Sequence, residues 1–179
     1  MGTCLPFPKE KLIIGVLISR RKLFPAVCEE LTARWGEIDY TSPFLPFDYT
    51  HYYDREMGSP IERVFLCFGS LIAPDLLPAV KRETNTIELR FAEDGLRRVN
   101  LDPGLLNLSR LVLATTKDGS HRVPLSSGVY AEVTLTYAKG TFQELPWTYP
   151  DFRSEEYAQI LSAIRERYRR QRSQHAGTA

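Results

Sequence analysis

The chain has 179 residues, of which 43% are hydrophobic and 25% charged, a composition typical of a folded globular protein. Its 23 lysines and arginines nearly balance 22 aspartates and glutamates, so the net charge of +1 gives no general attraction to nucleic acid or acidic membranes. The longest apolar run, Leu12–Ile18, is too short to span a bilayer, and the first residues lack the pattern of a signal peptide. We therefore expect one cytoplasmic domain over residues 1–179, with an ordered core of about 11–172, short flexible termini and no membrane contact.

Cysteines and histidines give no sign of a metal centre. Cys4, Cys28 and Cys67 have no metal-ligand spacing and no neighbouring histidine, so we expect reduced, buried thiols. Three histidines, one of them the tail residue His175, are too few for a multi-histidine site. The chain also lacks a P-loop, a dinucleotide-binding glycine motif and a nucleophile elbow, and it identifies no cofactor.

The first half of the chain alternates between strand and helix patterns. The continuous apolar run Leu12–Ile18 predicts a strand covered on both faces and therefore central in its sheet. Apolar residues at helical spacing predict a helix over Leu23–Trp35, which Gly36 ends. The elements expected next are extended chain at 38–45, a buried strand at 63–69, a helix from about 73 to 91 and a short strand at 98–101.

The second half is dominated by strand patterns separated by glycine turns. We expect antiparallel strands at 108–116, 121–125, 129–138 and 141–145, although 108–116 would also suit a helical turn. Ser154 can cap a last helix, and the residues after 172 are expected to fray.

The order of elements predicts the fold class. A β-α-β-β-α-β first half indicates an α+β protein, a two-layer sandwich of ferredoxin-like arrangement, extended by an antiparallel meander and a C-terminal helix. The alternative is an α/β sandwich with a mixed sheet.

Two polar segments lie beside these predicted strands. In the first, Arg98, Asn100 and Asp102 alternate and so share one face, and Asp102-Pro103-Gly104 then predicts a turn. The second segment, around a glycine turn, carries four further polar side chains: Lys117, Asp118, His121 and Arg122. We expect the two segments to meet at one edge of the sheet and to form a polar cleft.

The side chains of this cleft suit an anionic ligand. Lysine and arginine bind phosphate or carboxylate groups, so Arg98, Lys117 and Arg122 would hold the anion. His121 or Asp118 would be the catalytic groups that move protons if a reaction takes place, while Asn100 and Asp102 would orient the ligand. The alternative is that these residues are solvated turns that bind nothing.

Other candidate site residues lie outside these two segments. Asp48 and Tyr52 belong to a long aromatic connection that would form either a ligand wall or a packing plug. Glu132 interrupts an apolar strand, and a buried carboxylate needs a partner, for which Arg98 or Lys117 are candidates. A magnesium site stays open as an alternative through four carboxylates: Asp48, Glu56, Asp102 and Glu132. The segment Trp147–Arg153 is expected to anchor the last helix, with Asp151 or Arg153 as further candidates for the cleft.

Several motifs together resemble one known family. They are Pro46-Phe47-Asp48-Tyr49-Thr50, Arg98-Val99-Asn100-Leu101-Asp102-Pro103-Gly104, Thr116-Lys117-Asp118, Tyr130-Ala131-Glu132-Val133-Thr134-Leu135 and Pro146-Trp147-Thr148-Tyr149-Pro150-Asp151. The chain resembles, from about Lys11 to Tyr168, the uncharacterised prokaryotic family catalogued as domain of unknown function 4416. The resemblance implies no established activity.

Two functional hypotheses follow from the sequence. In the first, the cleft binds a small anion such as a nucleotide or a phosphorylated metabolite. In the second, the aromatic connection 44–53 and the arginine-rich last helix form an interaction module for protein or RNA, although a role in nucleic-acid binding is disfavoured. Homodimerisation through a sheet edge is compatible with either.

Overall fold

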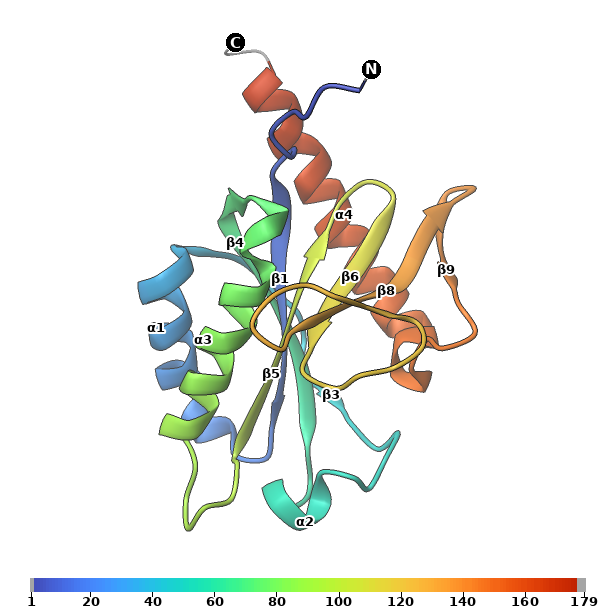
Figure 1. Cartoon of the computed structure of the whole chain (residues 1–179). Helices are drawn as coiled ribbons and strands as arrows, with labels where there is room; N and C mark the ends of the chain where they lie inside the picture. The colour runs from blue at the N-terminus through green and yellow to red at the C-terminus, as the bar shows by residue number, and fades with distance from the viewer. Residues whose placement is uncertain (1, 177–179) are drawn as a thin grey trace.

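The computed structural model describes residues 2–176. In this part of the chain nine strands form one sheet in the order β2-β4-β1-β5-β6-β8-β7, with β3 beside β4 and β9 beside β8 (Figure 1). The strands are β1 (Glu10–Ile18), β2 (Ile38–Thr41), β3 (Leu45–Pro46), β4 (Glu62–Ile72), β5 (Val99–Leu106), β6 (Arg110–Thr115), β7 (Arg122–Pro124), β8 (Tyr130–Ala138) and β9 (Thr141–Glu144). The helices are α1 (Phe24–Trp35), α2 (Asp54–Met57), α3 (Leu77–Arg90) and α4 (Glu155–Ala176), with 3₁₀ turns η1 (Arg21–Leu23), η2 (Pro74–Leu76) and η3 (Pro150–Arg153).

The prediction of an α+β protein is confirmed. Helices and strands are both present, and every strand pairing is antiparallel. The alternative of a mixed sheet is therefore wrong. The strand β1 lies between β4 and β5 and is buried from Glu10 to Ile18, as its continuous apolar run predicts.

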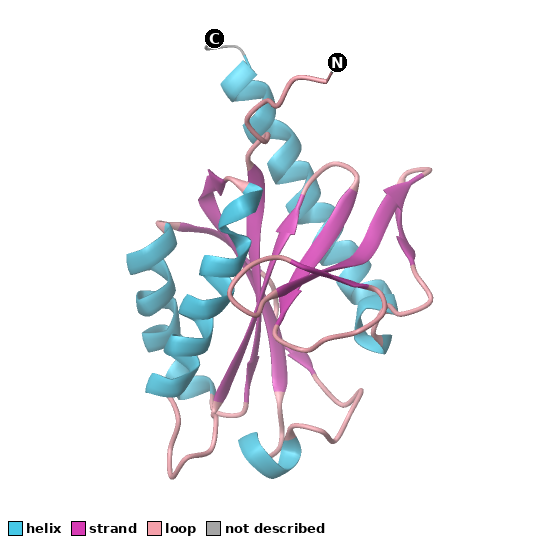
Figure 2. Ribbon diagram, in the orientation of Figure 1, coloured by secondary structure: helices cyan, strands magenta, loops and turns pink. Residues whose placement is uncertain are grey.

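The prediction of a two-layer sandwich is wrong because helices cover both faces of the sheet. Alternate residues of β1 point to opposite faces. Leu12 and Ile14 join a core beneath α1 and α3, whereas Ile13 joins a second core with Leu161 and Ile164 of α4. Figure 2 shows α1 and α3 on the near side of the sheet and α4 behind it. The molecule therefore has three layers here, with the sheet in the middle.

Local sequence signals explain where the helices begin and end. Pro25 lies in the first turn of α1, and Gly36 ends that helix with a φ of +84°. Pro78 lies in the first turn of α3, where a missing N–H costs nothing. The Ser154 hydroxyl accepts the Tyr157 N–H at 3.3 Å and caps α4.

The last helix is longer than expected. It continues to Ala176, past the predicted end at 172, and the final residues 177–179 lie outside the described part. No described helix, α4 included, combines the length and apolarity needed to cross a membrane.

The predicted meander is interrupted. The strand β7 pairs with β8 and not with β6, and β9 pairs with the later part of the same strand. The segment that follows β6, from Thr116 to His121, is therefore not a tight hairpin turn. It is left free to contribute to the cavity described below.

The predicted turn at Asp102-Pro103-Gly104 is also wrong, because β5 runs straight through it. Along its whole length β5 pairs with β1, but with β6 it pairs at three positions, from Gly104↔Leu113 to Leu106↔Leu111. The next residue along β5 is Pro103, which has no N–H to offer a neighbouring strand. From this point β5 and β6 diverge, as Figure 1 shows, and the sheet is forked.

Gly104 holds the closed end of this fork together. A Cβ atom at this position would lie 2.5 Å from the Val112 carbonyl oxygen, closer than real contacts allow. The glycine is needed because the two backbones approach closely there.

Candidate functional site

A cavity of about 680 Å³ opens where β5 and β6 separate, and we call it the fork cavity. Its walls come from α3, from strands β4, β5, β6 and β8, and from the loops before α2 and around η3. Among the described residues, five cations and four carboxylates line it: Arg63, Lys81, Arg97, Lys117 and Arg122, and Glu88, Asp102, Glu132 and Asp151.

Arg63 is the central charge of the cavity. Its side chain extends from β4 across Gly15 of β1, where a Cβ atom would come within 2.6 Å of Nη1. Beyond the glycine it reaches Asp102 on β5, the residue paired with Gly15, and Nη1 donates to Oδ2 at 2.8 Å. The side chain is 4% exposed, so the ion pair is largely withdrawn from water.

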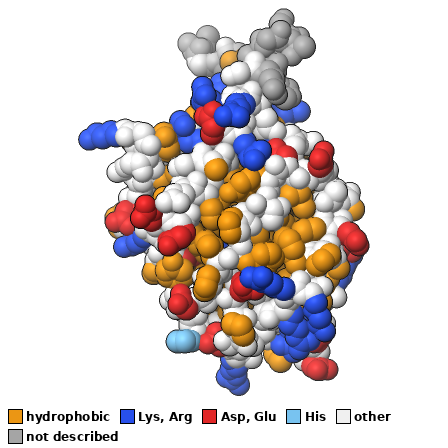
Figure 3. All heavy atoms as spheres, turned by 180° about the vertical axis from the view of Figure 1, so that it is seen from behind, with side chains coloured by type: hydrophobic (Ala, Val, Ile, Leu, Met, Phe, Trp, Pro, Cys, Tyr) orange, Lys and Arg blue, Asp and Glu red, His pale blue; other side chains and the backbone are white. Residues whose placement is uncertain are grey.

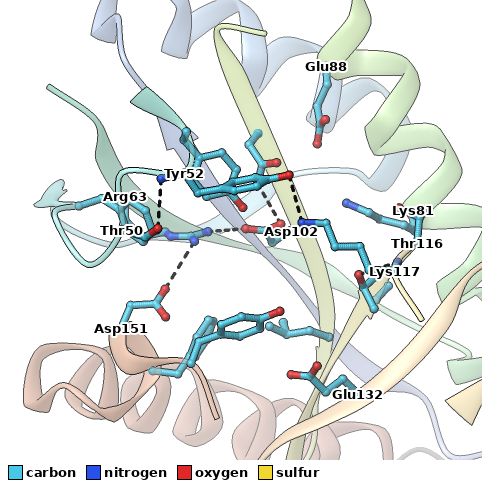
Figure 4. Close-up of a pocket in the computed structure, with 18 of the residues that line it drawn as sticks. Thr50, Tyr52, Arg63, Lys81, Glu88, Asp102, Thr116, Lys117, Glu132 and Asp151 are labelled. Atoms are coloured by element: carbon cyan, nitrogen blue, oxygen red, sulfur yellow. Dashed lines mark hydrogen bonds and ion pairs between the residues drawn. The ribbon is translucent and has the colours of Figure 1, made fainter. Parts of the chain in front are cut away.

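A second carboxylate, Asp151 of η3, approaches Arg63 from the α4 side. Its Oδ2 lies 3.6 Å from Nη2, and its side chain is 7% exposed (Figure 4). Burial raises the pKa of Asp151, although Arg63 opposes the shift. Burial would also raise the pKa of Asp102, but Arg63 and Lys81 outweigh it and hold that pKa below its usual value. Two carboxylates beside one guanidinium therefore have opposite tendencies to hold a proton.

Two lysines, one from each side of the fork, also reach into the cavity. Lys81 of α3 is buried, and its Nζ donates to the Leu101 carbonyl oxygen at 2.9 Å. Lys117, after β6, is exposed; its Nζ lies 4.5 Å from the centre of the Tyr52 ring and 3.4 Å from the Tyr52 hydroxyl. Neither lysine makes an ion pair within 4 Å in the described part of the chain. Figure 4 shows both side chains extending into the same part of the cavity.

The remaining charges are paired within the protein. Arg97 binds Glu56 at 2.7 Å and Glu88 at 3.3 Å. Burial raises the pKa of Glu88, with Lys81 opposing the shift. Glu132, which is 3% exposed, pairs with Arg122 at 2.9 Å. These ion pairs form one wall of the cavity, which we call the polar wall. Among the described lining residues, Lys81 and Lys117 are left as the cations without a close carboxylate.

The expected partners of Glu132 were wrong. Instead of Arg98 or Lys117, its Oε2 contacts Arg122 Nε and, at 3.0 Å, His121 Nε2. The His121 ring stacks on Trp147 with a centroid distance of 5.2 Å.

The two segments predicted from the sequence do converge, but not every residue of them faces the cavity. Asn100, Asp102, Lys117 and Arg122 line it, as do Glu132 and Tyr52. Arg98 is not a lining residue: its Nε lies 3.4 Å from Glu93.

The predicted proton-moving residues lie away from the cavity. His121 contacts the cavity wall through Glu132, and the exposed Asp118 accepts the neighbouring Gly119 N–H at 2.7 Å. Asp48 is exposed and is not a lining residue either.

The aromatic connection contains both a packed ring and rings that line the cavity. Phe47 is buried at 8% exposure and packs as a plug, while Tyr49 and Tyr52 line the cavity with 41% and 62% of their surface exposed. The Tyr53 ring lies between these extremes, and burial raises the pKa of its hydroxyl. The rings therefore form an amphipathic wall opposite the polar wall.

Sequence reasoning missed Arg63, Lys81 and Glu88. Arg63 and Glu88 could have been noticed, because each is a charged residue within an apolar strand or helix face. Gly15 in the central strand is a further signal, because it leaves room for the Arg63 side chain. Lys81 had none, because lysines on helices are usually solvated.

The carboxylates named above as a possible magnesium site do not come together in the described part of the chain. In residues 2–176 no three His, Cys, Asp or Glu side chains gather where they could hold an ion, so Asp48, Glu56, Asp102 and Glu132 do not assemble the magnesium site left open above. Cys67 is buried, but Cys4 is exposed, contrary to expectation.

Several arginines of the last helix make contacts within the protein. The Arg165 guanidinium lies 3.6 Å from the centre of the Tyr137 ring, and Arg169 and Arg170 both pair with Glu166. Figure 3 shows apolar side chains gathered over the middle of the face behind the sheet. A protein or RNA partner for the aromatic connection 44–53 and the arginine-rich last helix, and a dimer through a sheet edge, stay predictions.

The molecule is thus an α+β protein whose antiparallel sheet forks around a charged cavity. The family model described as Domain of unknown function (DUF4416) matches residues 8–168, and the chain belongs to this family. No curated protein and no solved structure matches the chain.

Proposed function

We propose that the protein binds an anionic small molecule, such as a nucleotide or another phosphorylated metabolite, in the fork cavity. The observation that carries this proposal is the pair Lys81 and Lys117. Both extend into the cavity, and neither has a carboxylate within 4 Å in the described structure. Two ammonium groups at one end of a sheltered cavity favour a group with more than one negative oxygen, such as a phosphate.

The three arginines that line the cavity are less suited than the two lysines to bind the anion. Arg63, Arg97 and Arg122 are each bound to carboxylates at 2.7 to 2.9 Å, so a ligand would have to displace a partner that is already in place. Of the three anion-binding cations expected from the sequence, Arg98, Lys117 and Arg122, we keep Lys117 and place Lys81 beside it in the proposed site.

The size and lining of the cavity support a small metabolite. A volume of about 680 Å³ lies in the range of cavities that enclose drug-sized ligands. Tyr49 and Tyr52 provide flat amphipathic rings on one side, and Asn100 and Asp102 provide hydrogen-bonding groups at the base.

We also infer that the scaffold of the site is ferredoxin-like. The strand order β2-β4-β1-β5, with α1 and α3 as the two connections, follows that arrangement. In this interpretation the fork is the junction between a ferredoxin-like first half and the added second half.

The proposal is tested by thermal-shift measurement with nucleotides, phosphorylated metabolites and their unphosphorylated counterparts. A ligand at about 100 times its Kd stabilises the folded state by about 2.7 kcal/mol, which raises Tm by several degrees. We expect Lys117→Ala and Lys81→Met each to weaken binding about tenfold or more, because each removes a charge-assisted hydrogen bond.

Lys22→Ala provides the matched control, since Lys22 is exposed on η1, away from the cavity. Selective stabilisation by phosphorylated compounds that survives both lysine changes would place the ligand elsewhere. Absence of any selective stabilisation would contradict the proposal.

A further inference from the structure

The carboxylates of the fork cavity have accepting capacity that the protein does not use. Arg63 is held by Asp102 at 2.8 Å and remains 3.6 Å from Asp151, beyond hydrogen-bonding distance. The backbone amides of Asp151 and Phe152 hydrogen-bond to the Asp151 carboxylate. No side chain of the described residues donates to this carboxylate within hydrogen-bonding distance. A buried carboxylate that lines a cavity in this state favours a donor supplied by a ligand.

The ligand group that meets Asp151 differs in charge from the group that the lysines bind, because the two ends of the cavity carry different charges. Figure 4 shows Lys81 and Lys117 at one end of the cavity and Asp151 at the other, with Arg63 and Asp102 between them. A ligand with negative charge at both ends would meet carboxylates at one of them. A ligand with an ammonium group at the second end would meet the positive charge of Arg63 there.

Hydroxyl groups satisfy both conditions. A hydroxyl is neutral, and it can donate to a carboxylate or accept from a carboxylic acid, so it suits Asp151 in either protonation state. Asp102 also lines the cavity; its Oδ1 accepts from Asn100 Nδ2 at 2.9 Å and its Oδ2 from Arg63 at 2.8 Å, and each oxygen keeps a second lone pair that can accept from a hydroxyl. Asp151 and Asp102 together therefore offer acceptors to a molecule that carries more than one hydroxyl.

We propose that the ligand is a phosphorylated sugar, whose phosphate lies between Lys81 and Lys117 and whose hydroxyls donate to Asp151 and Asp102. This inference rests on the proposed function and specifies its ligand class. The same chemistry is found in a free sugar phosphate and in the ribose phosphate of a nucleotide.

The test is isothermal titration calorimetry of the whole chain with four probes: inorganic phosphate, ribose, ribose 5-phosphate and adenosine monophosphate. We expect ribose 5-phosphate to bind at least about tenfold more tightly than phosphate, because hydroxyl bonds to a buried carboxylate add to the anion contact. Adenosine monophosphate binding more tightly still would identify a nucleotide as the source of the sugar. Equal or weaker binding would identify the free sugar phosphate.

Variants assign the contact to its residue. Asp151→Asn keeps the side-chain volume and should reduce the preference for ribose 5-phosphate over phosphate while leaving phosphate binding in place. Asp75→Asn, a change at an exposed position of η2, should alter neither.

The outcomes separate the two proposals. If phosphate binds and the lysine variants abolish its binding, but ribose 5-phosphate binds no more tightly, the sugar inference is overturned and the anion site stands. If no phosphorylated probe binds, both fail. If the preference for ribose 5-phosphate is unchanged in Asp151→Asn, the assignment to Asp151 is overturned.

Discussion

At the scale of single residues, the position of Arg63 depends on a residue in another strand. Its guanidinium passes over the central strand at the one place in that strand, Gly15, where no side chain stands in the way. The ion pair with Asp102 and the approach of Asp151 both follow from this passage.

We therefore expect Gly15→Ala to displace Arg63 and to lower the free energy of unfolding by about 1–3 kcal/mol, the usual cost of overpacking. Urea denaturation measures this loss. The matched control is Gly69→Ala in β4, where the added Cβ would meet the nearest atom at an ordinary 3.7 Å. An equal effect of the two changes would contradict the role of Gly15.

The two aspartates should give stability profiles of opposite sign against pH. The pKa of Asp151 is raised on folding, so the folded state keeps a proton that the unfolded chain has lost, and stability falls as pH rises above 3.8 towards the folded pKa. The pKa of Asp102 is lowered, so its contribution is present above pH 3.8 and is lost as pH falls below that value.

Asparagine does not titrate, and the difference from the wild type therefore isolates each group. Relative to the wild type, Asp151→Asn should become more stable as pH rises from about 3 to 7, whereas Asp102→Asn should be most destabilised near neutrality and less so in acid. Urea denaturation across this range tests the signs, and parallel profiles for the two variants would contradict the assignments.

The sequence indicated residues that line the cavity where the polar side chain lies on a strand. Asn100 and Glu132 could be named because strand alternation fixes which residues share a face. Lys81 could not, because whether a lysine on a helix is buried depends on which strand lies opposite it, and this is a tertiary property.

At the scale of elements, the fork between β5 and β6 could not be predicted, because the sequence predicts a turn at this place. Asp, Pro and Gly in succession normally turn the chain, but here the pairing of β5 with β1 keeps it extended. The same residues nevertheless mark the site, since Pro103 ends the pairing with β6 and Gly104 permits the last close contact before the strands part.

Gly104→Ala should destabilise the protein more than Gly15→Ala does. The added Cβ would meet the Val112 backbone, which cannot move as the end of the Arg63 side chain can. We expect a loss of at least about 1–3 kcal/mol in urea denaturation. A smaller loss than that of Gly15→Ala would show that β6 shifts easily.

At the scale of the whole molecule, α4 decides the number of layers. Its apolar stripe covers the face of the sheet opposite α1 and α3, with Tyr157, Leu161 and Ile164 buried to 1% or less. The apolar stripe of α4 could be predicted from the helical spacing of its apolar residues. The face of the sheet that the stripe covers could not, because this spacing does not show on which side of the sheet the loop after β9 places the helix.

We expect Leu161→Ala to cost about 2–5 kcal/mol, the range for emptying a buried leucine site. The neighbouring exposed change Ser162→Ala should stay within about 0.5 kcal/mol. Thermal or urea denaturation distinguishes them, and similar small effects would argue that α4 packs loosely.

Within the sheet, the strands before the fork and those after it are joined at three paired positions between β5 and β6. A ligand that binds both Lys81 of α3 and Lys117 after β6 would link the part of the sheet up to β5 with the part from β6 on. We expect amide hydrogen exchange in β5 and β6 to slow when such a ligand binds.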